Sequence, residues 1–252
     1  PMASFGEDIA KAIPLLERKF NTEQTKYNFK LLLEDGKFGH SNAAITAAKK
    51  LVEVDEVRFL VVGSSGEILQ IAQFVESTRV LAVAGFASHP DVRKAGDFIF
   101  RTYIDAERGV HLVADDMLKK GFMRVVVISE ESSFTLAIKN SLQQFLGEKL
   151  VSAEDYAFGE TDFRALVAKL RGKKPQAYYI NTATPVNFIA LFKQLRENGV
   201  REPFYAYYTP SLKDVQEALS DKLDGTVYLD YPDTMESSED FKTFQAEFES
   251  QT

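Results

Sequence analysis

The sequence of 252 residues contains no cysteine and only three histidines. Without cysteine, disulfide frameworks, thiol nucleophiles and thiolate metal sites are excluded. A cysteine-free chain is compatible with an oxidising compartment. None of the histidines, His40, His89 and His111, has another histidine four positions on, so we expect no metal site.

Long apolar runs are also missing, as is an excess of positive charge. No stretch approaches the roughly 20 apolar residues that span a bilayer, and no signal-peptide pattern opens the sequence. The 30 basic residues are outnumbered by 37 acidic ones, which gives a formal charge of −7 spread along the chain. Nucleic acid and anionic lipid are therefore poor candidates as partners, because both require clustered Lys and Arg.

Motifs of the common enzyme classes are absent too. The sequence has no GxxxxGK[ST], no GxGxxG and no GxSxG. Adjacent acidic pairs such as Glu130-Glu131 and Asp115-Asp116 could suggest acid–base catalysis, but we expect their side chains to point apart into solvent. The sequence thus predicts neither catalysis nor a cofactor.

The most informative stretch of the chain lies at residues 57–76. An apolar run at 57–62 predicts a buried strand, and apolar positions at helical spacing predict a helix over 67–76. Gly63-Ser64-Ser65-Gly66 lies between them. Unpaired N–H groups at the start of a helix, with two small hydroxyls, suit a carboxylate or another anion. The alternative is an ordinary strand-to-helix turn in which serine only caps the helix.

A second loop supports the binding interpretation. The apolar run at 80–84 predicts a further strand, and it is followed by small residues at 85–90. In a parallel sheet with alternating helices both loops emerge at the same carboxyl edge, where open α/β sheets bind ligands.

The whole chain predicts an α/β protein built as two lobes in series, with the boundary near residues 102–105. Strands are expected at 27–33, 57–62, 80–84, 97–104, 124–128, 150–156, 177–181, 203–207 and 226–229. One helix carries Ile9, Ile13, Leu16 and Phe20 on one face, and Pro14 should kink or interrupt it. The other helices are expected after a Ser41 cap, at 67–76, from Asp105 onward, and at 133–146, 162–170, 185–198, 211–219 and 238–248.

The order of these motifs resembles a known family, the type I periplasmic binding proteins, in the leucine/isoleucine/valine-binding branch that serves ABC importers. Six short motifs carry the resemblance: Leu33-Glu34-Asp35, Gly63-Ser64-Ser65-Gly66, Ala87-Ser88-His89-Pro90, Phe100-Arg101-Thr102, Gly159-Glu160-Thr161-Asp162-Phe163 and Leu195-Arg196-Glu197-Asn198-Gly199.

The resemblance implies two Rossmann-like lobes with parallel sheets, joined by hinge strands. The first lobe would comprise residues 1–103, with 234–252 returning to it and both ends incomplete, and the second residues 104–233. It also implies an extracytoplasmic receptor that closes on a small ligand and delivers it to an ABC permease in the membrane.

The same resemblance implies a set of ligand-binding residues. Ser64, Ser65, Ala87 and Ser88 correspond to the positions that hold the ligand carboxylate. Phe134 corresponds to an aromatic cover, and Asn181 opens a loop of the second lobe that faces the ligand. From the strand pattern, Tyr205 should be core, whereas Tyr208 ends a strand and should meet the ligand.

One departure bears on the ligand. Amino-acid binders of this family commonly have an acidic residue where this chain has Tyr208 and Thr209. A buried ammonium without an anionic partner is costly. We therefore expect a small carboxylate or an amide, unless Glu130, Glu131 or Asp230 substitutes for the acid. Two alternative functions are a metabolite-sensing regulatory module and a scaffold that uses the fold only for protein contacts.

Overall fold

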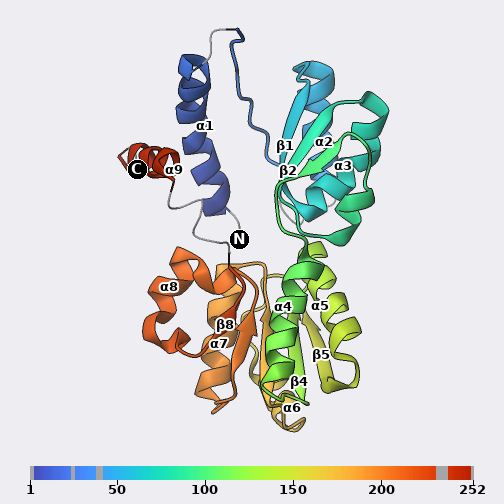
Figure 1. Ribbon diagram of the computed structural model, residues 1–252, viewed down its shortest axis with the longest axis vertical. Coiled ribbons are helices and arrows are strands. Elements are labelled where there is room, and N and C mark those ends of the chain that lie inside the picture. Colours follow the sequence, from blue (N-terminus) through green and yellow to red (C-terminus); the bar gives the residue numbers. More distant parts are fainter. Residues whose placement is uncertain (1–2, 24–25, 38–41, 231–237, 251–252) are drawn as a thin grey trace.

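The computed structural model describes residues 3–23, 26–37, 42–230 and 238–250. Two parallel sheets lie one above the other in Figure 1 and are joined by short connections. The first sheet has the order β1-β2-β3, with β1 (Phe59–Ser64), β2 (Leu81–Phe86) and β3 (Ile99–Arg101). The second has the order β5-β4-β6-β7-β8, with β4 (Val125–Glu130), β5 (Leu150–Tyr156), β6 (Ala177–Asn181), β7 (Phe204–Ala206) and β8 (Val227–Tyr228). The predicted α/β class with parallel sheets is confirmed.

The second sheet is covered on both faces, and its sequence explains why. All six residues of β4 and all five of β6 are buried, as expected of central parallel strands between two helical layers. One face packs against α4 (Ala106–Lys119) and α5 (Ser133–Leu146). The other packs against α6 (Arg164–Arg171), α7 (Pro185–Glu197) and α8 (Lys213–Leu219).

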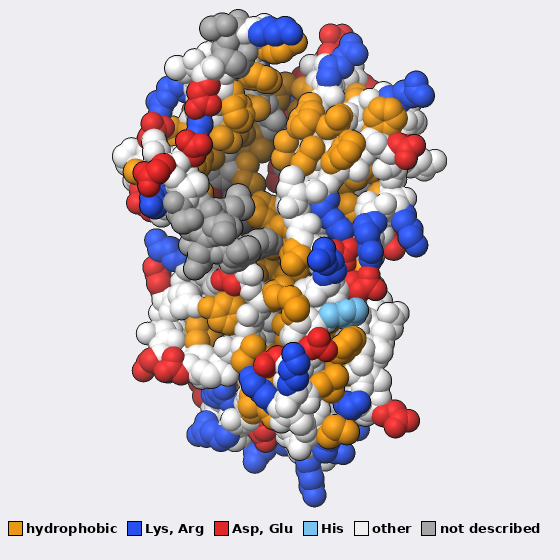
Figure 2. Space-filling model, viewed as in Figure 1, with side chains coloured by type: hydrophobic (Ala, Val, Ile, Leu, Met, Phe, Trp, Pro, Cys, Tyr) orange, Lys and Arg blue, Asp and Glu red, His pale blue; other side chains and the backbone are white. Residues whose placement is uncertain are grey.

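Within the described part of the chain, helices cover the first sheet on one face only. There α2 (Ala43–Lys49), a π-helical turn (Lys50–Val54) and α3 (Ser65–Thr78) bury side chains such as Leu60 and Ala84. On the opposite face Phe59, Val61 and Phe100 are 55%, 75% and 53% exposed. Hydrophobic side chains surround a hollow on this side in Figure 2.

The two terminal helices lie beside each other rather than on the first sheet. α1 (Ala3–Glu23) contacts α9 (Glu239–Glu249), and Arg18 forms an ion pair of 3.1 Å with Glu247. Both helices are set apart from β1 to β3 in Figure 1. None of the helices in the described ranges combines the length and apolar character needed to cross a bilayer.

Several expected elements differ from the structure. Residues 27–33 are extended but form no strand, because no neighbouring strand in the described part of the chain pairs with them. Pro14 does not interrupt α1, which continues through it. His40 and Ser41 lie outside the described residues, and α2 follows Asn42 without a side-chain cap.

Most boundaries in the second half match the sequence prediction. The bounds of α5, β5 and β6 agree to the residue, while β3 and β7 are shorter than expected. After α4 and α7 the chain turns at Gly121 and Gly199, whose φ angles of 78° and 81° favour glycine. The expected Gly-Ser turn is absent, since β1 runs to Ser64 and α3 begins at Ser65.

Candidate ligand-binding site

The two predicted loops of the first sheet meet at its carboxyl edge. β1 and β2 are parallel, and Ser64 lies opposite Phe86. The side chain of Ser65 is 2% exposed, and its Oγ accepts hydrogen bonds from the N–H groups of Ser88 (3.0 Å) and His89 (3.1 Å). Ser65 therefore joins the start of α3 to the loop that follows β2.

Ser64 has a local role at the same helix end. Its Oγ accepts the N–H of Glu67 at 3.3 Å, and the Glu67 carboxylate accepts the N–H of Ser64 at 3.0 Å. This is a capping box, the arrangement that the alternative interpretation of the Gly-Ser stretch expected. The Ser64 hydroxyl is thus engaged with the helix.

Ser88 differs from both. It is fully buried, and its Oγ has no hydrogen-bond partner within the described ranges. The neighbouring Ala87 is also buried. Arg101 stabilises the loop after β2, because it donates hydrogen bonds to the His89 carbonyl at 3.2 Å and to Asp105 at 2.7 Å. Buried hydroxyls without partners are uncommon. The Ser88 hydroxyl is therefore the group at this edge of the first sheet that could still form a hydrogen bond with a ligand.

His89 is a turn residue. Its Nδ1 accepts the N–H of Asp91 at 3.1 Å and caps the 3₁₀ turn Pro90–Lys94. His111 is exposed on α4, where its ring lies 4.7 Å from that of Phe145. Across the described residues no group of three or more His, Cys, Asp or Glu could hold a metal ion.

In the second sheet the strand order places two of the predicted residues at a switch point. The chain leaves β4 for β5 on one side and returns to β6 on the other, and ligands bind outside the strand ends at such a point. Asn181 ends β6, is buried, and donates from Nδ2 to Ser129 Oγ (2.8 Å) and to the Thr135 carbonyl (2.7 Å). The neighbouring Phe134 is in the first turn of α5.

Three aromatic rings lie beside this switch point. The Phe134 ring centroid is 5.4 Å from that of Tyr207 and 5.8 Å from that of Tyr208. Tyr205 is buried in the core, as predicted, and Tyr207 is buried with it, whereas Tyr208 lies at the edge. Desolvation, with a smaller contribution from the charge of Glu130, raises the pKa of Tyr208 to about 12, so it is a neutral phenol near pH 7.

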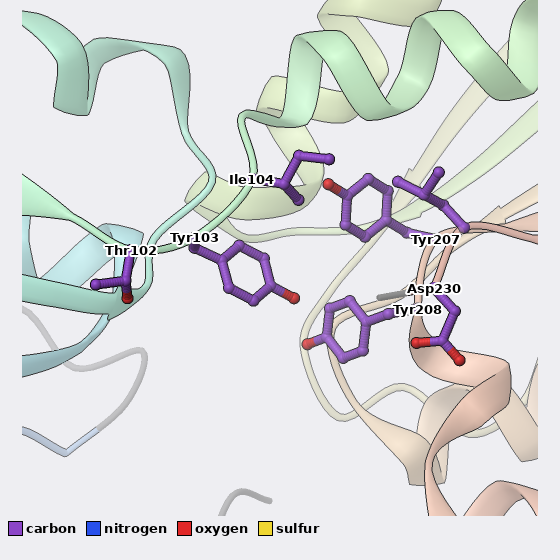
Figure 3. A pocket seen from close by; sticks show the side chains of 7 residues that line it. Thr102, Tyr103, Ile104, Tyr207, Tyr208 and Asp230 are labelled. Atoms are coloured by element: carbon purple, nitrogen blue, oxygen red, sulfur yellow. The ribbon is translucent and has the colours of Figure 1, made fainter. Parts of the chain in front are cut away.

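Tyr208 also lines a cavity of about 310 Å³ where the chain crosses between the sheets. Figure 3 shows the rings of Tyr103 and Tyr208 on either side of this space. Of the seven predicted site residues it contains Tyr208 alone; its lining residues are Thr102, Tyr103, Ile104, Tyr207, Tyr208, Leu229 and Asp230. The cavity adjoins the first-sheet loop, because Thr102 Oγ1 donates to the Gly85 carbonyl at 3.3 Å.

Glu130 is where the sequence prediction was wrong. Glu131 is exposed as expected, but Glu130 is 1% exposed. Its carboxylate accepts hydrogen bonds from the N–H groups of Ala183 (2.7 Å) and Thr184 (3.2 Å) and from the Thr184 hydroxyl (3.0 Å). Burial raises its pKa despite these bonds. The sequence did hold a signal, since Glu130 lies two positions after the apolar run Val125–Ile128, close enough to end the same central strand.

A family model described as periplasmic binding protein matches residues 1–252. The chain belongs to the periplasmic binding protein family. The resemblance found in the sequence motifs is thereby confirmed, and the two-sheet architecture agrees with it.

Solved structures of periplasmic binding proteins share the fold. The leucine-binding protein LivK of Thermotoga maritima superposes with a TM-score of 0.81 at 20% identity, over 100% of this chain and 73% of that one. LivJ of Streptococcus pneumoniae, in complex with isoleucine, gives 0.84 at 17% identity, over 100% and 74%. An R. palustris solute-binding protein in complex with 4-hydroxybenzoate gives 0.82 at 15% identity, over 99% and 70%. No curated protein matches the chain.

Three acidic residues, Glu130, Glu131 and Asp230, could substitute for the acid that amino-acid binders of this family commonly carry at the position of Tyr208 and Thr209. Glu130 is hydrogen-bonded to the β6–α7 loop, and Glu131 is exposed. Asp230 alone of the three lines the cavity beside Tyr208.

Proposed function

We propose that the chain is an extracytoplasmic solute-binding receptor of an ABC importer. Family membership supports this role, as do the structural neighbours that hold isoleucine or 4-hydroxybenzoate. A receptor of this kind passes its ligand to a membrane permease and performs no reaction itself.

The proposed ligand position is between the two lobes. The first lobe would comprise residues 1–103 together with 234–252, and the second residues 104–233. Ser64, Ser65, Ala87 and Ser88 would face the ligand from the first lobe, in part through backbone groups, and Phe134, Asn181 and Tyr208 from the second. Binding must favour the closed arrangement over the open one, since a ligand shifts an equilibrium only through a difference in affinity.

The proposed ligand is a small carboxylate without an ammonium group. The Ser88 hydroxyl carries this proposal, because it is buried beside a helix N-terminus and has no partner in the described part of the chain. A carboxylate is the group that such a hydroxyl and helix end favour. The aromatic rings of Phe134 and Tyr208 offer an apolar cover, which suits an aromatic acid.

The test is isothermal titration calorimetry with benzoate, 4-hydroxybenzoate, benzamide and isoleucine, on the wild-type protein and on Ser88→Ala. Because the Ser88 hydroxyl has no hydrogen-bond partner among the described residues, its loss should leave the melting temperature unchanged. The affinity for a carboxylate should fall about tenfold or more, as expected for a lost hydrogen bond to a charged group.

Ser77→Ala is the matched control, since Ser77 is exposed near the far end of α3 and its substitution should change neither quantity. Tight binding of isoleucine with no binding of benzoate would contradict the proposed ligand class. Carboxylate affinity unchanged in Ser88→Ala would contradict the proposed position.

A further inference from the structure

A buried carboxylate connects three loops of the second lobe. Glu130 is the last residue of β4, and its three donors belong to the loop between β6 and α7. Thr184 is the N-cap residue of α7, yet its own side chain makes no capping bond. Glu130 instead accepts the N–H groups of Ala183 and Thr184, which directly precede Pro185 at the helix end where a negative charge is favoured.

The connection continues from this loop to Tyr208. The carbonyl of Thr182 accepts a hydrogen bond from the Thr209 hydroxyl at 2.9 Å, and Thr209 is 1% exposed. Thr209 directly follows Tyr208. Glu130 is therefore linked, through residues 182–184 and Thr209, to the aromatic residue at the end of β7.

Among the described residues, the groups around Glu130 that titrate are phenols, and no cation forms an ion pair with it. Burial raises the pKa values of Tyr156 in β5 and Tyr208 in the loop after β7. The negative charge of Glu130 raises both values further. No ion pair of Glu130 is present in the described ranges. Its ionised form depends on the two N–H groups and the Thr184 hydroxyl, and burial opposes it.

We infer that Glu130 is a positioning residue whose ionised carboxylate holds the loop at 182–184, and through Thr209 also Tyr208, in the arrangement that receives ligand. Protonation would disrupt this arrangement, because a carboxylic acid brings a donor to a place that already holds backbone donors. The expected pH dependence of this loop follows from the hydrogen bonds that Glu130 accepts. Its effect on ligand binding rests on the proposed function.

The first test needs no ligand. Amide ¹H–¹⁵N shifts of Ala183, Thr184, Tyr208 and Thr209 are followed between pH 4 and pH 8. They should titrate with one common midpoint above the usual glutamate pKa of about 4.3. The transition should be absent in Glu130→Gln and unchanged in the matched control Glu131→Gln, whose substituted side chain is exposed.

The variant Thr184→Val distinguishes the proposed role of Glu130 from a purely structural one. It removes one bond that lowers the pKa of Glu130, so the common midpoint should move to higher pH. An unmoved midpoint, or shifts of Tyr208 and Thr209 that do not follow those of Ala183, would overturn the inference.

The second test uses benzoate. Its affinity in the wild-type protein should fall as pH is lowered through that midpoint. Glu130→Gln should bind about tenfold more weakly at pH 7 and lose this dependence, on the scale of a hydrogen bond to a charged group. Glu131→Gln should keep the wild-type pH profile, whereas any dependence that remains in Glu130→Gln reports protonation of benzoate itself. If no carboxylate binds any variant, the proposed function fails, while the amide titration still decides the role of Glu130. Equal pH profiles in Glu130→Gln and Glu131→Gln would overturn the inference even if benzoate binds.

Discussion

Gly109 occupies a position in α4 where a side chain has no room. A methyl group there would lie 2.5 Å from Leu229 Cδ2 and 2.9 Å from the Tyr207 hydroxyl. Both neighbours border the crossing between the sheets, and the cavity described above lies beside them. The absence of a side chain thus allows α4 to approach the connection between the lobes.

We expect Gly109→Ala to lower the free energy of unfolding by about 1–3 kcal/mol through overpacking, measured by urea denaturation. This loss should appear although alanine is the better helix former by about 1 kcal/mol. Gly66→Ala is the matched control, because the nearest atom to its added methyl would be Ser133 Oγ at 3.6 Å. A Gly109→Ala protein as stable as Gly66→Ala would contradict the packing argument.

The sequence predicted which positions belong to the site, but not which groups their side chains bond to. The sequence marked Ser64 and Ser65 as a pair of small hydroxyls, but their different roles depend on where β1 ends and α3 begins. Ser65 bonds to Ser88 and His89, which are more than twenty positions away in the chain, and only the β1–β2 register brings them together. Glu130 was misjudged for a related reason, since its partners in the β6–α7 loop are also remote in sequence.

At the scale of an element, the start of α4 combines a helix cap with charge pairs. Asp105 is the N-cap residue, and its Oδ1 accepts the N–H of Glu107 at 3.0 Å. Its Oδ2 lies 2.7 Å from Arg101 and 3.0 Å from Arg93. The carboxylate is 8% exposed, so this end of the helix is fixed to the end of the first sheet.

We expect Asp105→Ala to destabilise the protein by about 1–3 kcal/mol, because the helix loses its cap and Arg101 loses its carboxylate partner, while Arg93 keeps Glu107. Asp105→Asn keeps a capping side chain and should recover part of this loss. Asp115→Ala, at an exposed position of the same helix, should be nearly neutral. Urea denaturation checks the order, and equal stabilities of the alanine and asparagine variants would show that the cap contributes nothing.

Elements were predictable where local pattern and tertiary surroundings agree. Both α5 and β6 match to the residue, since their apolar spacing coincides with full coverage by neighbouring layers. Residues 27–33 have a strand-like composition, yet a strand exists only when another strand pairs with its backbone. A composition rule cannot supply that partner.

For the whole molecule, the tyrosines of the second lobe predict a response to alkaline pH. Desolvation raises the pKa of Tyr178 to about 12, as for Tyr208, and raises those of Tyr156, Tyr179 and Tyr207 as well. In the unfolded chain these phenols ionise near pH 10. Their contribution to stability is therefore complete below about pH 10 and is lost as pH rises toward the folded-state values.

Absorbance at 295 nm should show fewer ionised tyrosines in the native protein than in urea at pH 11. The free energy of unfolding should also be lower at pH 11 than at pH 8, because the unfolded chain gains from ionising these groups. Superimposable titration curves for the native and urea-unfolded protein would contradict the burial argument.

The switch point of the second sheet has a consequence for how this receptor can diversify. The residues proposed to contact ligand from this lobe follow β4, β6 and β7, whereas the strands and helices beneath them form two continuous apolar cores. Substitutions in those loops can alter the recognised solute without repacking either core. A lineage of such receptors can thus acquire new solutes while conserving one scaffold, and directed evolution of this chain should begin in the same three segments.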